Sequence, residues 1–155
     1  MTLDEYLDIG ETRIIGSHTF TADEIKVFAK KFDPQPFHVD EEAARHSLLG
    51  GLCASGWHTA AMWMRCNLLS LEKTPLVWKG EGPAPVFGPS PGFENLRWIK
   101  PVYAGDTITY TRTNLSHRAL ATRPGWRMLS MKSSGFNQKN ETVIEFDSTV
   151  LIQFG

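Results

Sequence analysis

One long helical pattern constrains the fold of this chain more than any other feature of its sequence. Apolar residues recur at helical spacing through residues 56–72, and one face carries Trp57, Ala60, Ala61, Met64, Leu68 and Leu71. Ser55, directly before this segment, is a favourable N-cap. Further apolar residues occupy the other faces, and a helix that is apolar on nearly all sides is usually buried. We therefore expect the rest of the chain to cover this helix.

The segments around the long helix predict mostly strands. Strand character is found in residues 13–20, 93–99, 107–115, 126–136 and 141–154. Shorter helices are expected from Thr21 to Phe32, where Thr21 and Glu24 have the spacing of a capping box, and over residues 41–46 behind Asp40. An antiparallel sheet that curves around one long helix would bury both, so we predict a single α+β domain over residues 1–155. Such a sheet has open edges, which pairing with a second copy would cover.

Composition excludes several classes of protein. The 155 residues include 16 basic and 17 acidic side chains, and the net charge of −1 does not fit a nucleic-acid binder or a polybasic membrane anchor. The longest apolar stretch is interrupted by Arg65 and Asn67, so no membrane span is expected, and residues 1–10 lack the pattern of a signal peptide. Two cysteines make no disulfide framework. We expect a cytoplasmic protein with reduced, buried cysteines.

A long irregular segment separates the helix from the strands. Residues 74–92 contain five prolines and four glycines, which disfavour both helix and strand. Loops of this length are usually functional. We expect this one to shape a binding pocket or the edge of a dimer.

The segment from Asp33 to Asp40 is the first candidate for chemistry. It places a carboxylate and an imidazole, Asp33 and His38, five residues apart and restricts the backbone between them with Pro34 and Pro36. A carboxylate and a histidine held on a rigid loop are suited to acid–base catalysis. The alternative is that Asp33 only ends a helix and His38 only bonds to backbone in a turn.

The second candidate lies at the start of the long helix, at Ser55 and Gly56. The N–H of Gly56 has no partner within the helix and lies at the positive end of the helix dipole, where it can bind a developing oxyanion. Glycine also allows close approach of a ligand. The alternative is that Ser55 is only an N-cap and Gly56 only a packing residue.

Together these segments resemble the MaoC-like family of hotdog-fold dehydratases, which includes the (R)-specific enoyl-CoA hydratases. The family motif is Asp, any residue, Asn, Pro, an apolar residue, His, any residue, then Asp or Asn; here residues 33–40 read DPQPFHVD. The later glycine at the start of the helix corresponds to Gly56, and residues 97–107 resemble the strand that follows the loop. Gln35 replaces the motif asparagine, and Ser55 stands where the family often has histidine.

The resemblance implies a hotdog fold, with a long central helix wrapped by a curved antiparallel sheet, and a hydro-lyase that adds water to an enoyl thioester or removes it. By the same resemblance Asp33 and His38 are the catalytic pair and the Gly56 N–H polarises the thioester carbonyl. We expect Ser55, Gln35 and Trp57 to contact the substrate. The resemblance further implies an acyl-CoA substrate in fatty acid metabolism, a homodimer or higher oligomer, and no cofactor.

Two other functions remain open on the same fold. A thioesterase would need a carboxylate on the long helix, which has none before Glu72. A non-catalytic acyl-thioester binding module needs no reactive pair. No metal is expected, because the residues His38, Asp40, His46 and His58 have no metal-site spacing. His58 is interpreted as a structural histidine.

Overall fold

The computed structural model describes residues 1–155 and contains one six-stranded antiparallel sheet with five helices. The helices are α1 (Leu3–Tyr6), α2 (Ala22–Phe32), α3 (Pro36–Val39), α4 (Glu41–Arg45) and α5 (Gly56–Lys73). The strands are β1 (Thr12–Thr19), β2 (Val86–Phe87), β3 (Gly92–Trp98), β4 (Thr107–Ala119), β5 (Trp126–Phe136) and β6 (Thr142–Gln153). The predicted α+β order is confirmed.

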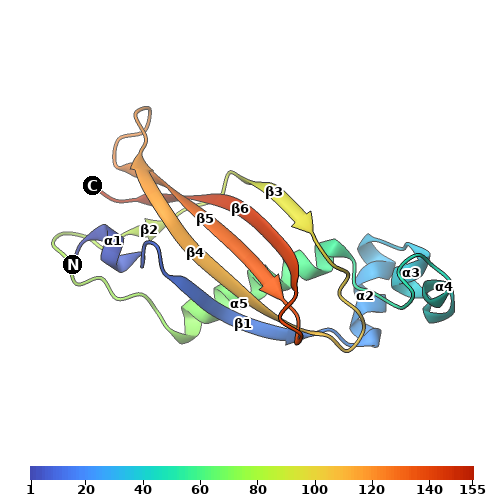
Figure 1. The fold of residues 1–155 in the computed structure, drawn as a ribbon. Helices are drawn as coiled ribbons and strands as arrows, with labels where there is room; N and C mark the ends of the chain where they lie inside the picture. Colours follow the sequence, from blue (N-terminus) through green and yellow to red (C-terminus); the bar gives the residue numbers. More distant parts are fainter.

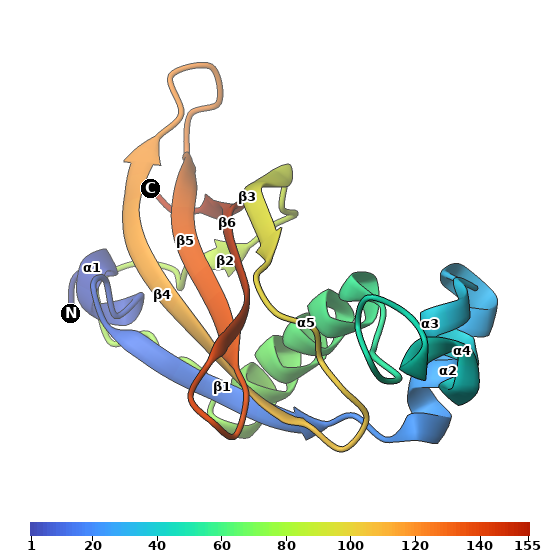
Figure 2. The same ribbon diagram turned by 45° about the vertical axis from the view of Figure 1, so that its right-hand side comes forward.

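The sheet has the order β1-β4-β5-β6-β2, with β3 also pairing with β6. Figures 1 and 2 show a strongly curved sheet, with α5 along one side of it and α2, α3 and α4 together at one end. No helix is both long and apolar enough to cross a membrane.

The main core lies between α5 and the sheet. Trp63 and Cys66 of α5 pack in one cluster with strand residues such as Ile108, Tyr110 and Ile144. Two polar groups at this interface are also satisfied, because the Tyr110 hydroxyl donates to the Thr59 carbonyl at 2.7 Å. Burial of each large apolar side chain contributes about 1.5–3 kcal/mol, so this cluster fixes α5 on the sheet.

Helix α5 is less buried than its composition predicts. Only His58, Thr59, Trp63 and Cys66 are buried in it. The side chains of Trp57, Met64 and Leu68 are 51%, 47% and 59% exposed. The prediction of a helix covered on nearly all sides is therefore wrong for the single chain, because the sheet covers one face and the next face borders an open cavity.

The caps predicted from sequence are confirmed at α2, α4 and α5. Thr21, Asp40 and Ser55 each accept hydrogen bonds from backbone N–H groups in the first turn that follows. Three short elements were not predicted: α1, α3 and β2. Helix α3 begins at Pro36, within the segment that sequence analysis treated as a proline-restricted loop. Proline is tolerated at the first helical position, since its fixed φ suits the helix and its missing N–H would be unpaired there anyway.

Candidate active site

The end of α2 and the single turn of α3 bring Asp33 and His38 together. Asp33 is the C-cap of α2, and its N–H donates to the Ala29 carbonyl at 2.8 Å. His38 lies in α3, and its Nε2 is 3.4 Å from Oδ2 of Asp33. Both side chains are largely buried, with 17% of Asp33 and 8% of His38 exposed. The proline-rich loop therefore makes a close, well-shielded carboxylate–imidazole pair.

A backbone contact determines which nitrogen of His38 faces Asp33. The Nδ1 of His38 lies 2.6 Å from the carbonyl oxygen of Cys53. A carbonyl oxygen can only accept, so Nδ1 carries the proton and donates it. In the neutral ring Nε2 is then unprotonated and presents its lone pair on the side of the carboxylate. This is the tautomer that a general base requires.

The Asp33 carboxylate is stabilised in its charged form. Burial raises its pKa, but hydrogen bonds from Gln35 and Ser55 and the nearby imidazole of His38 outweigh burial, so the pKa lies below its ordinary value. The Gln35 contact is short, with Nε2 donating to Oδ1 at 2.6 Å. Gln35 thus holds the carboxylate directly. Ser55 is fully buried and also caps α5.

Gly56, at the start of α5, is covered by the indole of Trp98. A Cβ built on Gly56 would lie 2.3 Å from Cε2 of Trp98, and Nε1 of Trp98 donates to the Gly56 carbonyl at 2.9 Å. Any side chain at position 56 would displace the indole. The close approach that this glycine allows is therefore made by Trp98, which sequence analysis did not single out.

A cleft of about 220 Å³ borders His38 and Gly56, whereas Asp33, Gln35 and Ser55 are not among its lining residues. Its lining includes His38, Gly56, Thr59, Trp98 and Lys100, together with the apolar residues Leu49, Cys53, Ala54, Pro101, Val102 and Val143. The lysine at this cleft forms an ion pair with Glu141. The cleft thus exposes the imidazole and the first turn of the long helix to the same space.

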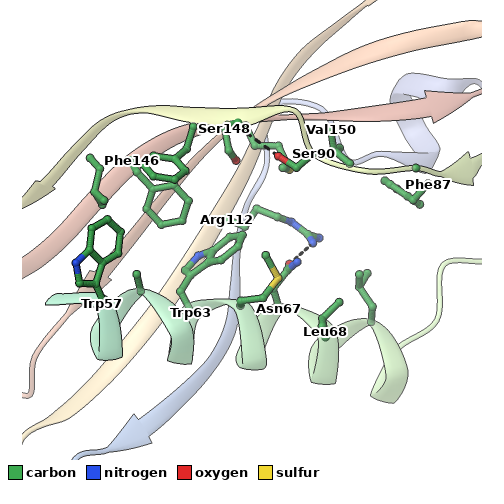
Figure 3. A pocket seen from close by; sticks show the side chains of 18 residues that line it. Trp57, Trp63, Asn67, Leu68, Phe87, Ser90, Arg112, Phe146, Ser148 and Val150 are labelled. Carbon is green, nitrogen blue, oxygen red and sulfur yellow. Dashed lines mark hydrogen bonds between the residues drawn. The ribbon is translucent and has the colours of Figure 1, made fainter. Parts of the chain in front are cut away.

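A second, larger cavity of about 600 Å³ runs along α5. Its walls are mostly apolar and come from α5, the segment that contains β2, and strands β3 to β6; Figure 3 shows the side chains between the helix and the sheet. Trp57 lines this cavity rather than the cleft. Its ring contacts Trp98 edge-on, with centroids 5.0 Å apart, so the indole pair stands between the two spaces.

Arg112 and Asn67 are polar side chains in this apolar cavity. The guanidinium Nη1 donates to Oδ1 of Asn67 at 2.6 Å (Figure 3). Burial lowers the pKa of Arg112. Neither residue was singled out as a pocket residue by the sequence, because only the pairing of β4 with its neighbours and the rotation of α5 bring the two side chains into one space.

Asp40 and His46 lie apart from the pair, whereas the thiol of Cys53 lies 3.6 Å from Nδ1 of His38. Asp40 caps α4, and His46 binds Glu42 on the surface with 75% of its side chain exposed. The thiol of Cys53 is buried, and burial and the charge of Asp33 raise its pKa to about 11. That thiol is therefore protonated at neutral pH and is not a nucleophile. Both cysteines are free and buried, as predicted.

This fold and site define a class of protein: an α+β domain whose long helix begins at a cleft lined by His38, with the Asp33 carboxylate 3.4 Å from its imidazole. The model of the MaoC like domain matches residues 8–123, so the chain belongs to the MaoC-like family. The hotdog fold predicted from the motif is confirmed by the solved structures to which the chain is similar.

Three of these similar proteins cover most of the chain. The uncharacterized protein YdeM of Bacillus subtilis strain 168 is 32% identical over 157 residues, which cover 99% of both chains. The MaoC-like dehydratase from Rhodospirillum rubrum is 38% identical with a TM-score of 0.78, covering 100% of this chain and 98% of that one. R-Hydratase PhaJ1 from Pseudomonas aeruginosa is 19% identical with a TM-score of 0.64, covering 95% and 83%, and supports the fold alone.

Proposed function

We propose that this protein is a hydro-lyase that adds water across the α,β double bond of an enoyl thioester, or removes it in reverse, with acyl-CoA as the carrier. The observation that carries the proposal is the pair itself. Asp33 Oδ2 and His38 Nε2 are 3.4 Å apart, and the contact with Cys53 fixes the imidazole so that Nε2 is free to take a proton.

A water molecule next to this pair would donate one hydrogen bond to the carboxylate and one to Nε2. As the water oxygen forms a bond to Cβ, His38 takes one of its protons, and the π electrons move through Cα to the thioester oxygen. The electron pair on that oxygen then returns to Cα and takes the proton held by His38, so the product is the 3-hydroxyacyl thioester and His38 is neutral again. The low pKa of Asp33 keeps its carboxylate charged and available to hold the water.

The negative charge on the thioester oxygen needs a donor, and the first turn of α5 supplies one. The N–H of Gly56 lies at the positive end of an 18-residue helix and borders the same cleft as His38. Such donors contribute roughly 3–4 kcal/mol to the transition state of related reactions. Trp98 forms a wall beside this donor and would orient the carbonyl.

The larger cavity would hold the acyl chain. Its volume of about 600 Å³ and its apolar walls suit an aliphatic chain better than the small cleft does. A chain that starts at the cleft would reach the cavity along the Trp98–Trp57 pair, whose rings are in contact. The loop segment with Phe87, Gly88 and Ser90 forms part of the cavity wall, in line with a functional role for this loop.

A second copy of the chain is part of the proposal. The sheet has open edges at β1 and β3, and Phe93 of β3 is 55% exposed. Strand pairing across an edge would satisfy unpaired backbone groups and cover apolar side chains such as this one. Light scattering coupled to gel filtration measures the mass; a monomer at micromolar concentration would contradict this part.

The test is a hydration assay on enoyl-CoA thioesters with short, branched and long acyl chains. The rate is measured from the loss of absorbance as the conjugated double bond disappears. Asp33→Asn and His38→Ala should each lower kcat by about 10²–10⁴-fold with the fold retained. His46→Ala is the matched control, since it removes an exposed histidine that also pairs with a carboxylate. Wild-type rates in either pair variant would refute the assignment, and release of free CoA instead of hydration would show a thioesterase.

A further inference from the structure

A second cluster of histidine and glutamate side chains lies outside the cleft. His18 of β1, Glu24 of α2 and His58 of α5 each offer one ligand atom, and these three atoms all lie within 4.8 Å of one another. Nε2 of His18 is 2.5 Å from Oε1 of Glu24. None of the three residues lines the cleft or the large cavity. The proposed hydratase mechanism uses none of them.

His58 has a ring nitrogen without a hydrogen-bond partner. The residue is 4% exposed, and its Nδ1 is buried with no partner. Its ring stacks on Phe28 with centroids 4.5 Å apart and meets Phe20 edge-on at 4.9 Å. Buried polar atoms in proteins are nearly always paired, so the imidazole of His58, a member of the cluster, has a bonding capacity that the chain itself does not satisfy.

The aromatic surroundings also favour the form of the imidazole that binds metals. The rings of Phe20 and Phe28 surround the His58 imidazole with apolar groups, and a neutral imidazole has a lone pair to offer a cation. The aromatic rings hold it in place without competing for that lone pair.

We propose that His18, Glu24 and His58 bind one divalent cation, and that the donor set suits Zn²⁺ best. Two imidazole nitrogens and one carboxylate oxygen are common zinc ligands, with bonds of about 2.0–2.2 Å and therefore ligand atoms about 3.3 Å apart in a tetrahedron. His18 Nε2 and Glu24 Oε1 are closer than this, at 2.5 Å, and all three ligand atoms lie within 4.8 Å of one another, so the side chains would have to shift to admit an ion. The side chains of His18 and Glu24 are 26% and 33% exposed, which leaves a route for the ion and a position for water.

The site would tie together three elements that are distant in sequence. Helix α2 ends at Asp33 and α5 begins at Gly56, and the cluster joins both helices to β1. A cation here would act on stability and on the placement of these helices, since the cluster does not border the cleft. The alternative is a His18–Glu24 ion pair beside a core histidine, with no ion.

The test uses the full chain without a histidine tag, after removal of metals by a chelator. Isothermal titration with Zn²⁺ should give one site per chain, and Zn²⁺ should raise Tm. Co²⁺ should give the visible absorption bands of a tetrahedral site. His18→Gln and Glu24→Gln remove ligands that are partly exposed and should keep the fold, while His58→Phe puts an apolar ring between Phe20 and Phe28.

Each of the three variants should weaken Zn²⁺ binding at least tenfold and abolish the rise in Tm. His46→Gln is the matched control, because it removes a histidine from an exposed pair with Glu42 and should leave binding unchanged. If His58→Phe does not fold, the other two variants decide the question. The proposal is overturned if the wild-type chain binds no Zn²⁺ at micromolar concentration, or if His18→Gln and Glu24→Gln bind it as tightly as wild type.

Discussion

The cleft at the start of α5 and the cavity along the rest of that helix differ in size and in polarity. In the cleft, His38 is held by a backbone carbonyl and paired with Asp33, which is held in turn by Gln35. The cavity has nearly three times the volume of the cleft, and its walls are mostly apolar, with the hydrogen-bonded Arg112–Asn67 pair among them (Figure 3).

One helix therefore contributes different properties to the two spaces. Its first turn supplies an unpaired N–H and a dipole, which suit charge. Its long apolar face supplies apolar surface, which suits the aliphatic chain of an acyl group. Under the proposed function the cleft sets the rate and the cavity sets which substrates are accepted, and changes at each place should separate these two effects.

Outside the Asp33–His38 pair, the largest effect is expected from Gly56→Ala. The added Cβ would lie 2.3 Å from the indole of Trp98, so the wall of the cleft must move. A misplacement of about 1 Å near the reacting atoms costs on the order of 100-fold in rate, and we expect kcat/KM to fall by about that factor for every chain length. Steady-state kinetics measure this.

Gly51→Ala is the control for Gly56→Ala, because a Cβ there meets Tyr103 at ordinary contact distance, 3.6 Å. It should keep wild-type activity. If Gly56→Ala keeps it too, then Trp98 is not part of the site.

The next effect should depend on chain length. Leu68 is 59% exposed and lines the cavity, so Leu68→Trp narrows the cavity without disturbing the core. Long-chain enoyl thioesters should lose roughly 10–50-fold in kcat/KM, within the range that an apolar pocket gives for a poor fit, while short ones are unaffected. Leu69→Trp changes the neighbouring residue, which does not line the cavity, and should leave kcat/KM unchanged for long and short chains alike. Equal losses for all chain lengths would place the acyl chain elsewhere.

A smaller effect is expected from Ser55→Ala. The change removes the N-cap of α5 and should cost about 1 kcal/mol of stability, or about 2–4 °C in Tm. It also removes a hydrogen bond that lowers the pKa of Asp33. Thr21→Ala removes the cap of α2 and should cost similar stability with no change in the pH profile. Differential scanning calorimetry measures the loss of stability in both variants, and pH–rate profiles distinguish Ser55→Ala from Thr21→Ala. If the profile of Ser55→Ala is the same as that of wild type, Ser55 does not influence Asp33.

The smallest effect concerns the acid limb of the pH profile. The folded pKa of Asp33 is depressed, so its contribution to stability is complete above the unfolded pKa and is lost as pH falls through the folded pKa. Gln35→Ala removes a bond that depresses it, so the acid limbs of activity and stability should both move to higher pH, with little change at neutral pH. Gln138→Ala is the control. It removes a similar surface hydrogen bond, from Gln138 to Asp106 at 2.8 Å, and should leave the acid limb of activity where it is in wild type. A limb unmoved in Gln35→Ala would contradict this role.

Local sequence signals were sufficient for much of the fold. The caps at Thr21, Asp40 and Ser55 begin helices because each side chain satisfies N–H groups a few residues away, and β5 has the bounds that its pattern predicts. The spacing of Asp33 and His38, with two prolines between them, left open both a reactive pair and two structural residues, and the resemblance to the MaoC-like family favoured the pair. These features depend on neighbours along the chain.

Tertiary structure decided what depends on distant residues. The helical pattern of α5 predicted an apolar face at Trp57, Met64 and Leu68, but only the curvature of the sheet decides that this face borders a cavity instead of a core. Likewise, Trp98 reaches Gly56 across 42 positions of sequence, and His18 meets His58 across 40. Periodicity specifies which residues share a face, whereas the partner of that face is set by packing across the whole domain.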